Sequence, residues 1–187
     1  ETIAHNFGGD DSISVRSGIA MLMGGTGKDA VTSTAEVFDN PSKMIVLGDN
    51  GIINVVHALG EMTVASTDTN IGDVDSISTG YGDDVVAGGT AGDTVATMAG
   101  QDIGFGDNAE LVFQLSTSFT SSTTSSVTFT KGYSITPKIG GDDVINSGDG
   151  DDKISGGAFA DYIMAGDGDD VVLGDHAKFD VVFVVQQ

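Results

Sequence analysis

The spacing of aspartate constrains this chain more than any other feature of its sequence. In three runs an aspartate recurs every nine residues, and an apolar residue stands two positions after it. A repeat of this length has room for one turn and one short strand, whose apolar residue would line a shared core. The aspartates are Asp11 and Asp29, with Ala20 between them; Asp75, Asp84, Asp93 and Asp102; and Asp143, Asp152, Asp161 and Asp170. The apolar residues are Ile13, Leu22, Val31, Ile77, Val86, Val95, Ile145, Ile154, Ile163 and Val172, and Gly104 interrupts the second run.

The three runs belong to larger repeats. Residues 71–113 align with residues 139–181 without a gap and share 16 identities in 43 positions. The first run aligns with the second at a shift of 64 residues, apart from about six extra residues around positions 40–42. We therefore predict three copies of one unit, at residues 1–66, 67–134 and 135–187, which together form one continuous solenoid.

Each unit continues from its nonapeptides into a second part that opens with Gly-Asp-Asn or Gly-Asp-His. Strand-like sequence follows at 52–56, 110–113 and 179–183, and second strands are predicted at 62–64 and 127–129. These pairs of strands predict β-hairpin excursions from the solenoid. The Ser/Thr-rich segment 116–130 is interpreted as an exposed hairpin tip, with O-glycosylation as an additional reading of its composition.

Two nonapeptides preserve the pattern best, Ser147-Gly148-Asp149-Gly150-Asp151-Asp152-Lys153-Ile154-Ser155 and Ala165-Gly166-Asp167-Gly168-Asp169-Asp170-Val171-Val172-Leu173, and the segment Thr79 to Ala87 is close behind. These sequences resemble the repeats-in-toxin (RTX) family of haemolysin-type calcium-binding proteins, whose unit is G-G-x-G-x-D-x-U-x. The resemblance covers roughly residues 6–32, 70–105 and 138–173. It implies an all-β fold, a parallel β-roll (β-solenoid) with β-hairpin excursions, that is secreted unfolded and folds outside the cell when it meets calcium.

The spacing also explains how such repeats would hold Ca²⁺. If two nonapeptides form one coil and coils stack at about 4.8 Å, turns 18 residues apart in sequence become neighbours. Aspartate carboxylates and main-chain carbonyls then converge between coils, and Ca²⁺ takes about six to eight oxygen ligands. About five paired-turn sites are predicted, at Asp11/Asp29, Asp75/Asp93, Asp84/Asp102, Asp143/Asp161 and Asp152/Asp170. Gly80, Gly82, Gly148, Gly150, Gly166 and Gly168 would let the backbone turn its carbonyls toward the ions.

Other residues of these turns leave alternatives open. Ala20 stands where the pattern expects an aspartate, so we predict that this side of the first run is empty and holds no ion. Ala91 and Phe159 replace a turn glycine, so calcium sites that use those turns are predicted to be distorted. Asp49, Asp107 and Asp175 belong to the Gly-Asp-Asn or Gly-Asp-His corner that opens the second part of each unit. They either cap this corner or complete a calcium site, and His176 is interpreted as a structural corner residue. Asp10, Asp83, Asp151 and Asp169 are predicted to be solvated or to lie behind the ligands. The alternative for the whole pattern is a metal-free solenoid in which aspartate only caps turns.

Charge and composition exclude several classes of function. The formal net charge is −21, and the 28 acidic residues are almost all Asp. Nucleic acid and anionic membranes are unsuitable partners for this charge, and no apolar run is long enough for membrane insertion. The chain has no Cys, so in a secreted protein metal would have to replace disulfides as the cross-link. The sequence contains no nucleophile elbow, zinc-type His pair or phosphate-binding loop, so we do not expect an enzyme.

We expect an extracellular or cell-surface structural protein, a unit of a secreted fibre, surface layer or appendage that associates with itself or with tandem neighbours. Residues 2–7 and 181–185, joined head to tail, would complete a hairpin, which favours such tandem continuation. One alternative is a stalk or binding segment of a large calcium-dependent adhesin, with surface glycans as ligands. Another is the secretion or folding tail of an exported enzyme or toxin.

Overall fold

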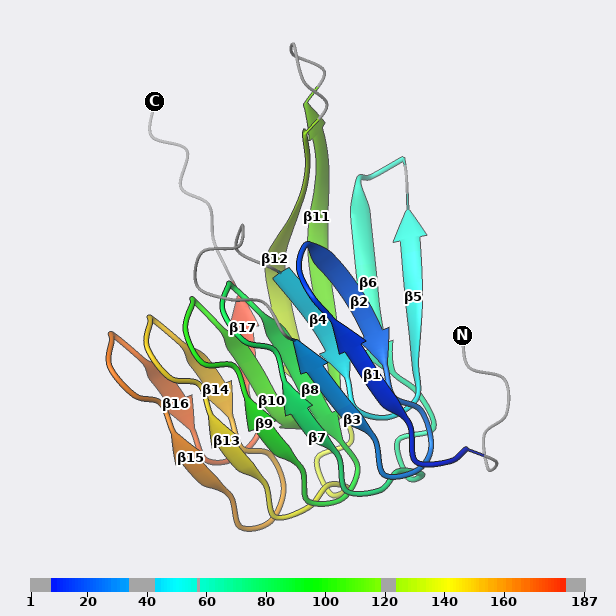
Figure 1. The fold of residues 1–187 in the computed structure, drawn as a ribbon, viewed down its shortest axis with the longest axis vertical. Coiled ribbons are helices and arrows are strands. Elements are labelled where there is room, and N and C mark those ends of the chain that lie inside the picture. The colour runs from blue at the N-terminus through cyan, green and yellow to red at the C-terminus, as the bar shows by residue number, and fades with distance from the viewer. Residues whose placement is uncertain (1–7, 34–42, 57, 119–123, 181–187) are drawn as a thin grey trace.

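The structure is a computed structural model that describes residues 8–33, 43–56, 58–118 and 124–180. These residues form seventeen β-strands and no helix (Figure 1), which confirms the prediction of an all-β chain. The strands of the nonapeptide runs are short because Gly-rich turns interrupt the chain after each of them. None of the described residues forms a helix that is long and apolar enough to cross a membrane.

Two of the three sheets are built from the nonapeptides, and all their strands are parallel. Sheet A has the strand order β1, β3, β7, β9, β13, β15, and sheet B has the order β2, β4, β8, β10, β14, β16. In sheet A the bounds are Ser12–Val15, Ala30–Ser33, Ser76–Ser78, Thr94–Ala96, Val144–Asn146 and Tyr162–Met164. In sheet B they are Ile19–Met23, Lys43–Leu47, Val85–Gly89, Ile103–Asp107, Lys153–Ser155 and Val171–Leu173.

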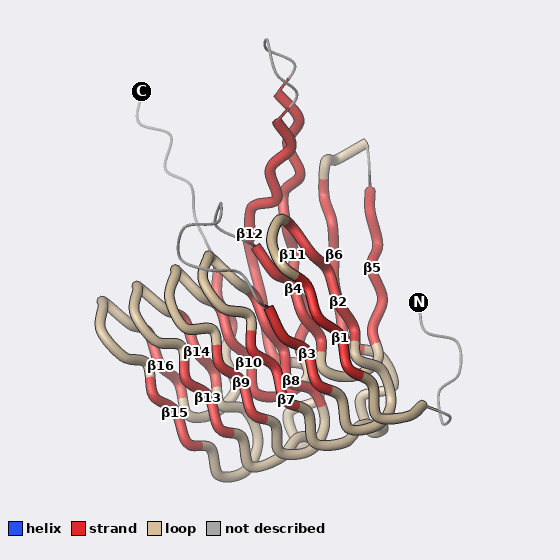
Figure 2. The backbone as a smooth tube through the Cα atoms, in the orientation of Figure 1, coloured by secondary structure: helices blue, strands red, loops and turns tan. Residues whose placement is uncertain are grey.

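The chain passes alternately through the two sheets, so each coil adds one strand to sheet A and one to sheet B (Figure 2). Neighbouring strands without an insertion pair 18 residues apart, as Ile145 and Ile163 do. Ile19 pairs with Lys43 at a longer separation because the extra residues of the first unit lie between β3 and β4. This arrangement is consistent with a parallel β-roll.

The interior between sheets A and B is lined by apolar residues of the nonapeptides, as predicted. Its buried members are Val31, Met44, Val46, Ile77, Val86, Val95, Ile145 and Ile154, each at most 1% exposed. Gly104 does not open a gap, because a Cβ at that position would stand 3.0 Å from Cδ1 of Ile154. The prediction that Val172 is a core residue was wrong: Val172 is 45% exposed, because β16 is the last strand of sheet B.

The predicted hairpins join into a third, antiparallel sheet. Sheet C has the strand order β5, β6, β11, β12, β17, with bounds Gly51–Val56, Glu61–Ser66, Ala109–Ser118, Thr124–Ser134 and Lys178–Asp180. The second strand of each hairpin pairs with the first strand of the next, in β6–β11 and again in β12–β17. Most of the segment predicted as a tip, 116–130, lies within β11 and β12, while 119–123 and the predicted strand residues 181–183 are outside the described residues.

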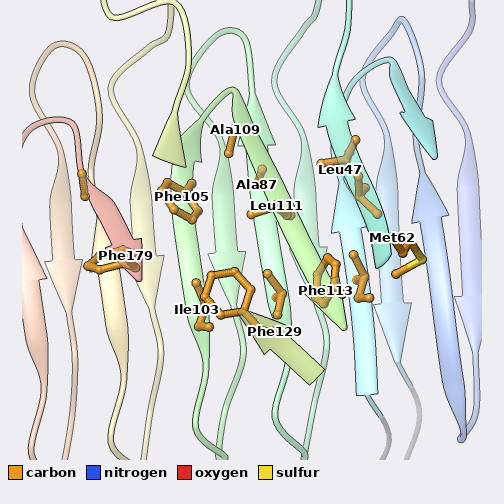
Figure 3. Packing of buried hydrophobic residues seen from close by; sticks show 14 residues of the cluster. Leu47, Met62, Ala87, Ile103, Phe105, Ala109, Leu111, Phe113, Phe129 and Phe179 are labelled. Atoms are coloured by element: carbon orange, nitrogen blue, oxygen red, sulfur yellow. The ribbon is translucent and has the colours of Figure 1, made fainter. Parts of the chain in front are cut away.

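Sheet C packs on sheet B and creates a second core (Figure 3). The ring of Phe105 in β10 lies 5.5 Å from that of Phe179 in β17, and Phe113 and Phe129 meet edge to face at 5.8 Å. Both faces of β4 and β8 in sheet B are therefore covered by apolar residues, whereas β16 at the end of the sheet is exposed. Four nonapeptides give only two coils, a core too thin to be stable by itself, so packing on the hairpins adds the apolar burial that a run lacks.

Candidate metal-binding turns

The turns between the two parallel sheets stack in two columns, and every predicted aspartate lies in one of them. Column 1 contains the turns that lead into sheet A, with Asp11, Asp29, Asp75, Asp93, Asp143 and Asp161 in stacking order. Column 2 contains the turns that lead into sheet B, with Asp84, Asp102, Asp152 and Asp170. The positions before them in column 2 are Ala20 and Met44, so this column has no aspartate in its first two coils, and the empty side of the first run stays a prediction.

In column 1, the main-chain N–H of each aspartate donates to Oδ1 of the aspartate in the next coil. The distances are 2.8 Å for Asp11 to Asp29, 2.7 Å for Asp29 to Asp75, 2.8 Å for Asp75 to Asp93, 2.7 Å for Asp93 to Asp143 and 3.0 Å for Asp143 to Asp161. Each carboxylate is thus held by the coil that precedes it.

Column 2 repeats this contact along its whole length. The main-chain N–H of Met44 donates to Oδ1 of Asp84 at 2.7 Å, and the row continues from Asp84 to Asp102 at 2.8 Å. It then runs from Asp102 to Asp152 at 2.8 Å and from Asp152 to Asp170 at 3.0 Å. The two columns therefore contain the same contact nine times in the described part of the chain.

All five predicted pairs are neighbours in these rows, but the sequence reasoning missed three more. Asp29 and Asp75, Asp93 and Asp143, and Asp102 and Asp152 also stack on one another across the hairpin insertions. Nothing in the nine-residue period identifies them, since 46 or 50 residues separate the partners. The repetition of the Gly-Asp corner before each hairpin was the only signal that the chain returns in register.

The second carboxylate oxygen of these aspartates is buried and accepts no hydrogen bond. This holds for Oδ2 of Asp29, Asp75, Asp84, Asp93, Asp102, Asp143, Asp152 and Asp161. A buried anionic oxygen without a partner is strongly unfavourable, so rows of them call for a cation.

The surroundings of these oxygens fit a small hard cation. In column 1 they face glycines: a Cβ on Gly24 would stand 2.5 Å from Oδ2 of Asp29, and one on Gly88 2.6 Å from Oδ2 of Asp93. Among the described residues, no three His, Cys, Asp or Glu side chains form a metal-holding group by themselves. Main-chain carbonyls of the turns would therefore complete the ligand set, and an all-oxygen set suits Ca²⁺.

Burial changes the protonation of both rows. Loss of solvation raises the pKa of Asp75 and Asp84 to about 7, of Asp102 and Asp143 to about 8, and of Asp93 to about 9. Neighbouring carboxylates add to this, as Asp143 does for the pKa of Asp93. Without a cation the rows therefore bind protons near neutral pH, and a cation that needs the ionised form would compete with those protons.

The turn glycines have the backbone conformation that the repeat requires. Gly80, Gly82, Gly148, Gly150, Gly166 and Gly168 all have positive φ, between 82° and 148°. Ala91 and Phe159, which replace a turn glycine, also have positive φ, at 79° and 76°, so the backbone keeps the conformation of the turn, and the distortion of metal sites there stays a prediction. Met98, with φ of 70°, takes the position of Gly80 and Gly148 in the same way. The stacked coils hold these three side-chain-bearing residues in the left-handed region, where conformational strain results.

Two of the corner aspartates, Asp49 and Asp107, accept main-chain N–H groups from later turns of column 1. Asp107 is 2% exposed, and its Oδ1 accepts the N–H of Gly141 at 3.1 Å while its Oδ2 accepts the N–H of Ala158. Asp49 is also 2% exposed and accepts the N–H of Thr90 at 2.6 Å. These contacts are those of a cap, but Oδ1 of Asp49 is buried without a hydrogen-bond partner, so the two alternatives for the corner aspartates both stay open. Burial raises the pKa of Asp49 to about 7 and that of Asp107 to about 6.

The residue after each corner aspartate contacts a residue that lies earlier in the chain. Nδ2 of Asn50 donates to Oγ1 of Thr26 at 2.9 Å, and Nδ2 of Asn108 donates to Oγ1 of Thr90 at 3.1 Å. In the third corner, Nε2 of His176 lies 2.7 Å from the carbonyl oxygen of Pro137. Its role in the structure is thus a corner contact.

Three of the outward aspartates form hydrogen bonds with the main chain of the neighbouring coil. Oδ1 of Asp10, Asp83 and Asp151 accepts the main-chain N–H of Lys28, Gln101 and Asp169 at 3.1, 3.0 and 3.0 Å, each in the next coil. Asp142, which the sequence reasoning did not single out, makes the same contact with Ala160 at 3.0 Å. These exposed carboxylates form an outer ladder of hydrogen bonds between coils, in addition to the two buried rows.

Comparison with protein families agrees with this geometry. The model of the RTX calcium-binding nonapeptide repeat, which describes four copies, matches residues 140–163 and again residues 147–175. These residues are RTX calcium-binding repeats. The RTX match contains Asp143, Asp152, Asp161 and Asp170 of the two columns, and calcium is the cation that repeats of this family bind. No curated protein and no solved structure matches the chain.

The first two units contain the same turn contacts as the RTX segment. The N–H of Asp75 donates to Asp93 and that of Asp84 to Asp102, as Asp143 and Asp152 do to their partners within the matched residues. The expectation of ions at the predicted pairs of these units stays a prediction.

Proposed function

We propose that this chain is a calcium-stabilised structural repeat of a secreted fibre, surface layer or appendage, folded as one continuous β-solenoid that associates end to end with copies of itself. The observation that carries this proposal is the pair of unbroken aspartate rows. The row of column 1 runs through all three units and that of column 2 through the second and third, with one contact geometry, and buried Oδ2 atoms in both rows have no hydrogen-bond partner.

A chain with a formal net charge of −21 is strained by its own repulsion, and the rows concentrate part of that charge in the interior. Calcium between coils would turn this repulsion into cross-links, so that folding and metal binding are coupled. Extracellular calcium modules work at about 10⁻⁴–10⁻³ M, a concentration found outside cells and not in a cytosol. This supports a site of action at the cell surface or beyond it.

The carboxylates support a structural rather than a catalytic role. Acid–base catalysis requires a few titratable groups with different environments around one reaction centre. Here the same main-chain contact recurs along both columns, and the second oxygens are enclosed between coils. We therefore propose that the chain is not an enzyme.

The test is to follow folding and assembly as calcium is varied. Far-ultraviolet circular dichroism and electron microscopy would be recorded in 5 mM CaCl₂, after excess EGTA, and with 5 mM MgCl₂ as the matched divalent control. We expect strand signal and filaments or sheets with calcium, and loss of both with EGTA or Mg²⁺. An ordered chain that stays monomeric in calcium would refute the fibre or layer, and equal order in EGTA would refute the calcium dependence.

The adhesin alternative has one observation in its favour. Strands β11 and β12 extend well beyond the other strands of sheet C and project from the roll (Figure 1). Their register continues as far as Ser118 opposite Thr124, so the projection is a paired ribbon rather than a loose loop. A glycan-array experiment with the calcium-loaded chain separates the two readings. Specific glycan binding that is lost when residues 116–126 are replaced by a short turn would favour the adhesin.

A further inference from the structure

We propose that the last coil of one copy binds the first coil of a second copy, in the register that the chain itself uses between its units. Strand β15 would pair in parallel with β1 of the next copy, and β16 with its β2. This proposal rests on the proposed function for the statement that copies associate, and it adds the surface, the register and the residues.

The chain contains this interface twice already. Between the first and second units, β3 pairs with β7 and β4 with β8, with Val31 opposite Ile77 and Val46 opposite Val86. Between the second and third units, β9 pairs with β13 and β10 with β14. Both junctions are formed after a hairpin insertion, so they join coils that are not consecutive in sequence. An unconnected coil of the same sequence pattern can make the same contacts.

Both ends of the roll expose what these junctions bury. Val172 is 45% exposed, whereas Ile154 and Val86 at the equivalent positions of β14 and β8 are fully buried. Ile13 in the first strand of sheet A and Ile163 in its last strand are only partly buried, whereas Ile77 and Ile145 at the equivalent positions of the junctions are 1% exposed. In the proposed register Ile163 lies opposite Ile13 and Val172 opposite Leu22, which continues both apolar rows of the roll.

The hydrogen bonds of column 1 continue across the same contact. In every step of the row, an aspartate N–H donates to Oδ1 of the aspartate in the following coil. Asp161 is the last aspartate of the row among the described residues, and Asp11 is the first. The N–H of Asp161 would therefore donate to Oδ1 of Asp11 in the next copy.

The third corner supplies a second, independent fit. Asp107 binds the turn that contains Gly157, and a Cβ on Gly157 would clash with Oδ2 of Asp107. In the same way, a Cβ on Gly89 would clash with Oδ2 of Asp49. Gly25 is the equivalent glycine of the first coil, with φ of 112°; it is buried, but no described residue places an atom within 4 Å of a Cβ built there. This space is where Asp175 of the preceding copy would lie. Its carboxylate would then accept the N–H of Thr26, as Asp49 accepts that of Thr90.

Charge favours the same arrangement in column 2. The last turn of this column contains Asp167, Asp169 and Asp170, whereas the first turn, residues 16–20, contains Arg16 and no acidic residue. Stacking the first turn on the last one therefore brings a cation to three carboxylates instead of adding like charges. A second copy of this chain is the occupant that satisfies the strand edges, the corner and the charge together.

Because the chain has no Cys, disulfide trapping can test the register directly. Ser12→Cys and Tyr162→Cys would be made as separate variants, mixed in calcium and oxidised. Neighbouring strands place such pairs within disulfide reach, while an offset of two residues does not. The offset control mixes Ser14→Cys with Tyr162→Cys, and the positive control is Val144→Cys with Tyr162→Cys in one chain, whose strands pair directly.

We expect at least fivefold more linked dimer from the in-register mixture than from the offset mixture, and little from either variant alone. Assemblies that sediment normally but give equal or no linkage in the two mixtures would overturn the register while leaving the proposed function intact. A chain that calcium orders but that stays monomeric in sedimentation would overturn both the docking and the self-association.

A second variant tests the corner without new cysteines. Asp175→Asn removes one of two acceptor oxygens, and we expect it to weaken association by about tenfold to a hundredfold, the effect of leaving a buried N–H without its charged acceptor. The matched control is Asp180→Asn, a carboxylate that is already paired with Lys178 at 2.7 Å. Equal association of the two variants would overturn the role given to Asp175.

Discussion

The main-chain N–H of Asp93 donates to Oδ1 of Asp143 at 2.7 Å, although 50 residues and a complete hairpin separate the two. This contact is the same as the one between Asp75 and Asp93, which are 18 residues apart. The hairpin insertion thus leaves the aspartate row unbroken. The units are therefore joined by the same main-chain contact that joins the coils within a unit.

Replacement of Asp93 by Asn is expected to change stability with opposite signs in the two metal states. Without metal, the amide keeps the Oδ1 contact and removes a carboxyl whose pKa burial raises to about 9, so stability should be unchanged or higher at pH 8. With calcium, the loss of a charged ligand should lower the unfolding free energy by about 1–3 kcal/mol. Urea denaturation of Asp93→Asn in EGTA and in calcium measures both effects.

The exposed Asp83→Asn variant is the matched control, because Asp83 contributes to the outer ladder and not to the buried row. The same calcium-dependent loss in both variants would contradict the assignment of the buried row as the ligand set.

The metal-free chain should become less stable as pH rises. Folding raises the pKa of Asp93, Asp102 and Asp143 from 3.8 to about 9, 8 and 8, so the folded state holds protons that the unfolded state has lost. Their stabilisation is complete below about pH 3.8 and disappears as pH rises through 8 to 9. With saturating calcium the trend should reverse over pH 5–8, because the metal needs the ionised form.

Urea midpoints at pH 5 to 9 in EGTA and in calcium would show these opposite slopes. Repeating the series in 0.5 M NaCl screens exposed charges but affects enclosed ones much less. A slope in EGTA that disappears in salt would contradict the assignment to buried carboxyls.

Replacement of Asp107 by Asn should be destabilising in both metal states. Both carboxylate oxygens accept main-chain N–H groups, from Gly141 and Ala158, and the Asn amide group would face one of these donors with a donor of its own. We expect a loss of about 1–3 kcal/mol with calcium and with EGTA alike. Asp175→Asn, at the equivalent exposed corner, should leave the unfolding midpoint of the monomer unchanged, and a loss restricted to calcium would instead make Asp107 a ligand.

Replacement of Phe159 by Gly should stabilise the chain. Phe159 has φ of 76° and is 69% exposed, so its side chain contributes little packing while its backbone is strained. Relief of that strain is expected to add about 1 kcal/mol, which thermal unfolding detects. Phe159→Ala removes the ring but keeps the strain and should add nothing, so equal gains from both variants would show that the ring itself was the cause.

The sequence determined the local chemistry of this protein. The nine-residue period placed the turns and the inward apolar residues, and the register of 18 residues predicted which aspartates become neighbours within a run. These features depend only on contacts between consecutive coils, whose spacing follows from the length of a strand and a turn.

Tertiary structure alone decided how the runs and hairpins combine. The stacking of Asp29 on Asp75 depends on where the hairpin returns, 46 residues further along the chain, and the burial of sheet B depends on pairing between successive hairpins. The positive φ of Phe159 and the exposure of Val172 are set by the neighbouring coil, present in one case and missing in the other. Period and composition describe each repeat by itself, whereas these properties arise from contacts between segments that no spacing in the sequence connects.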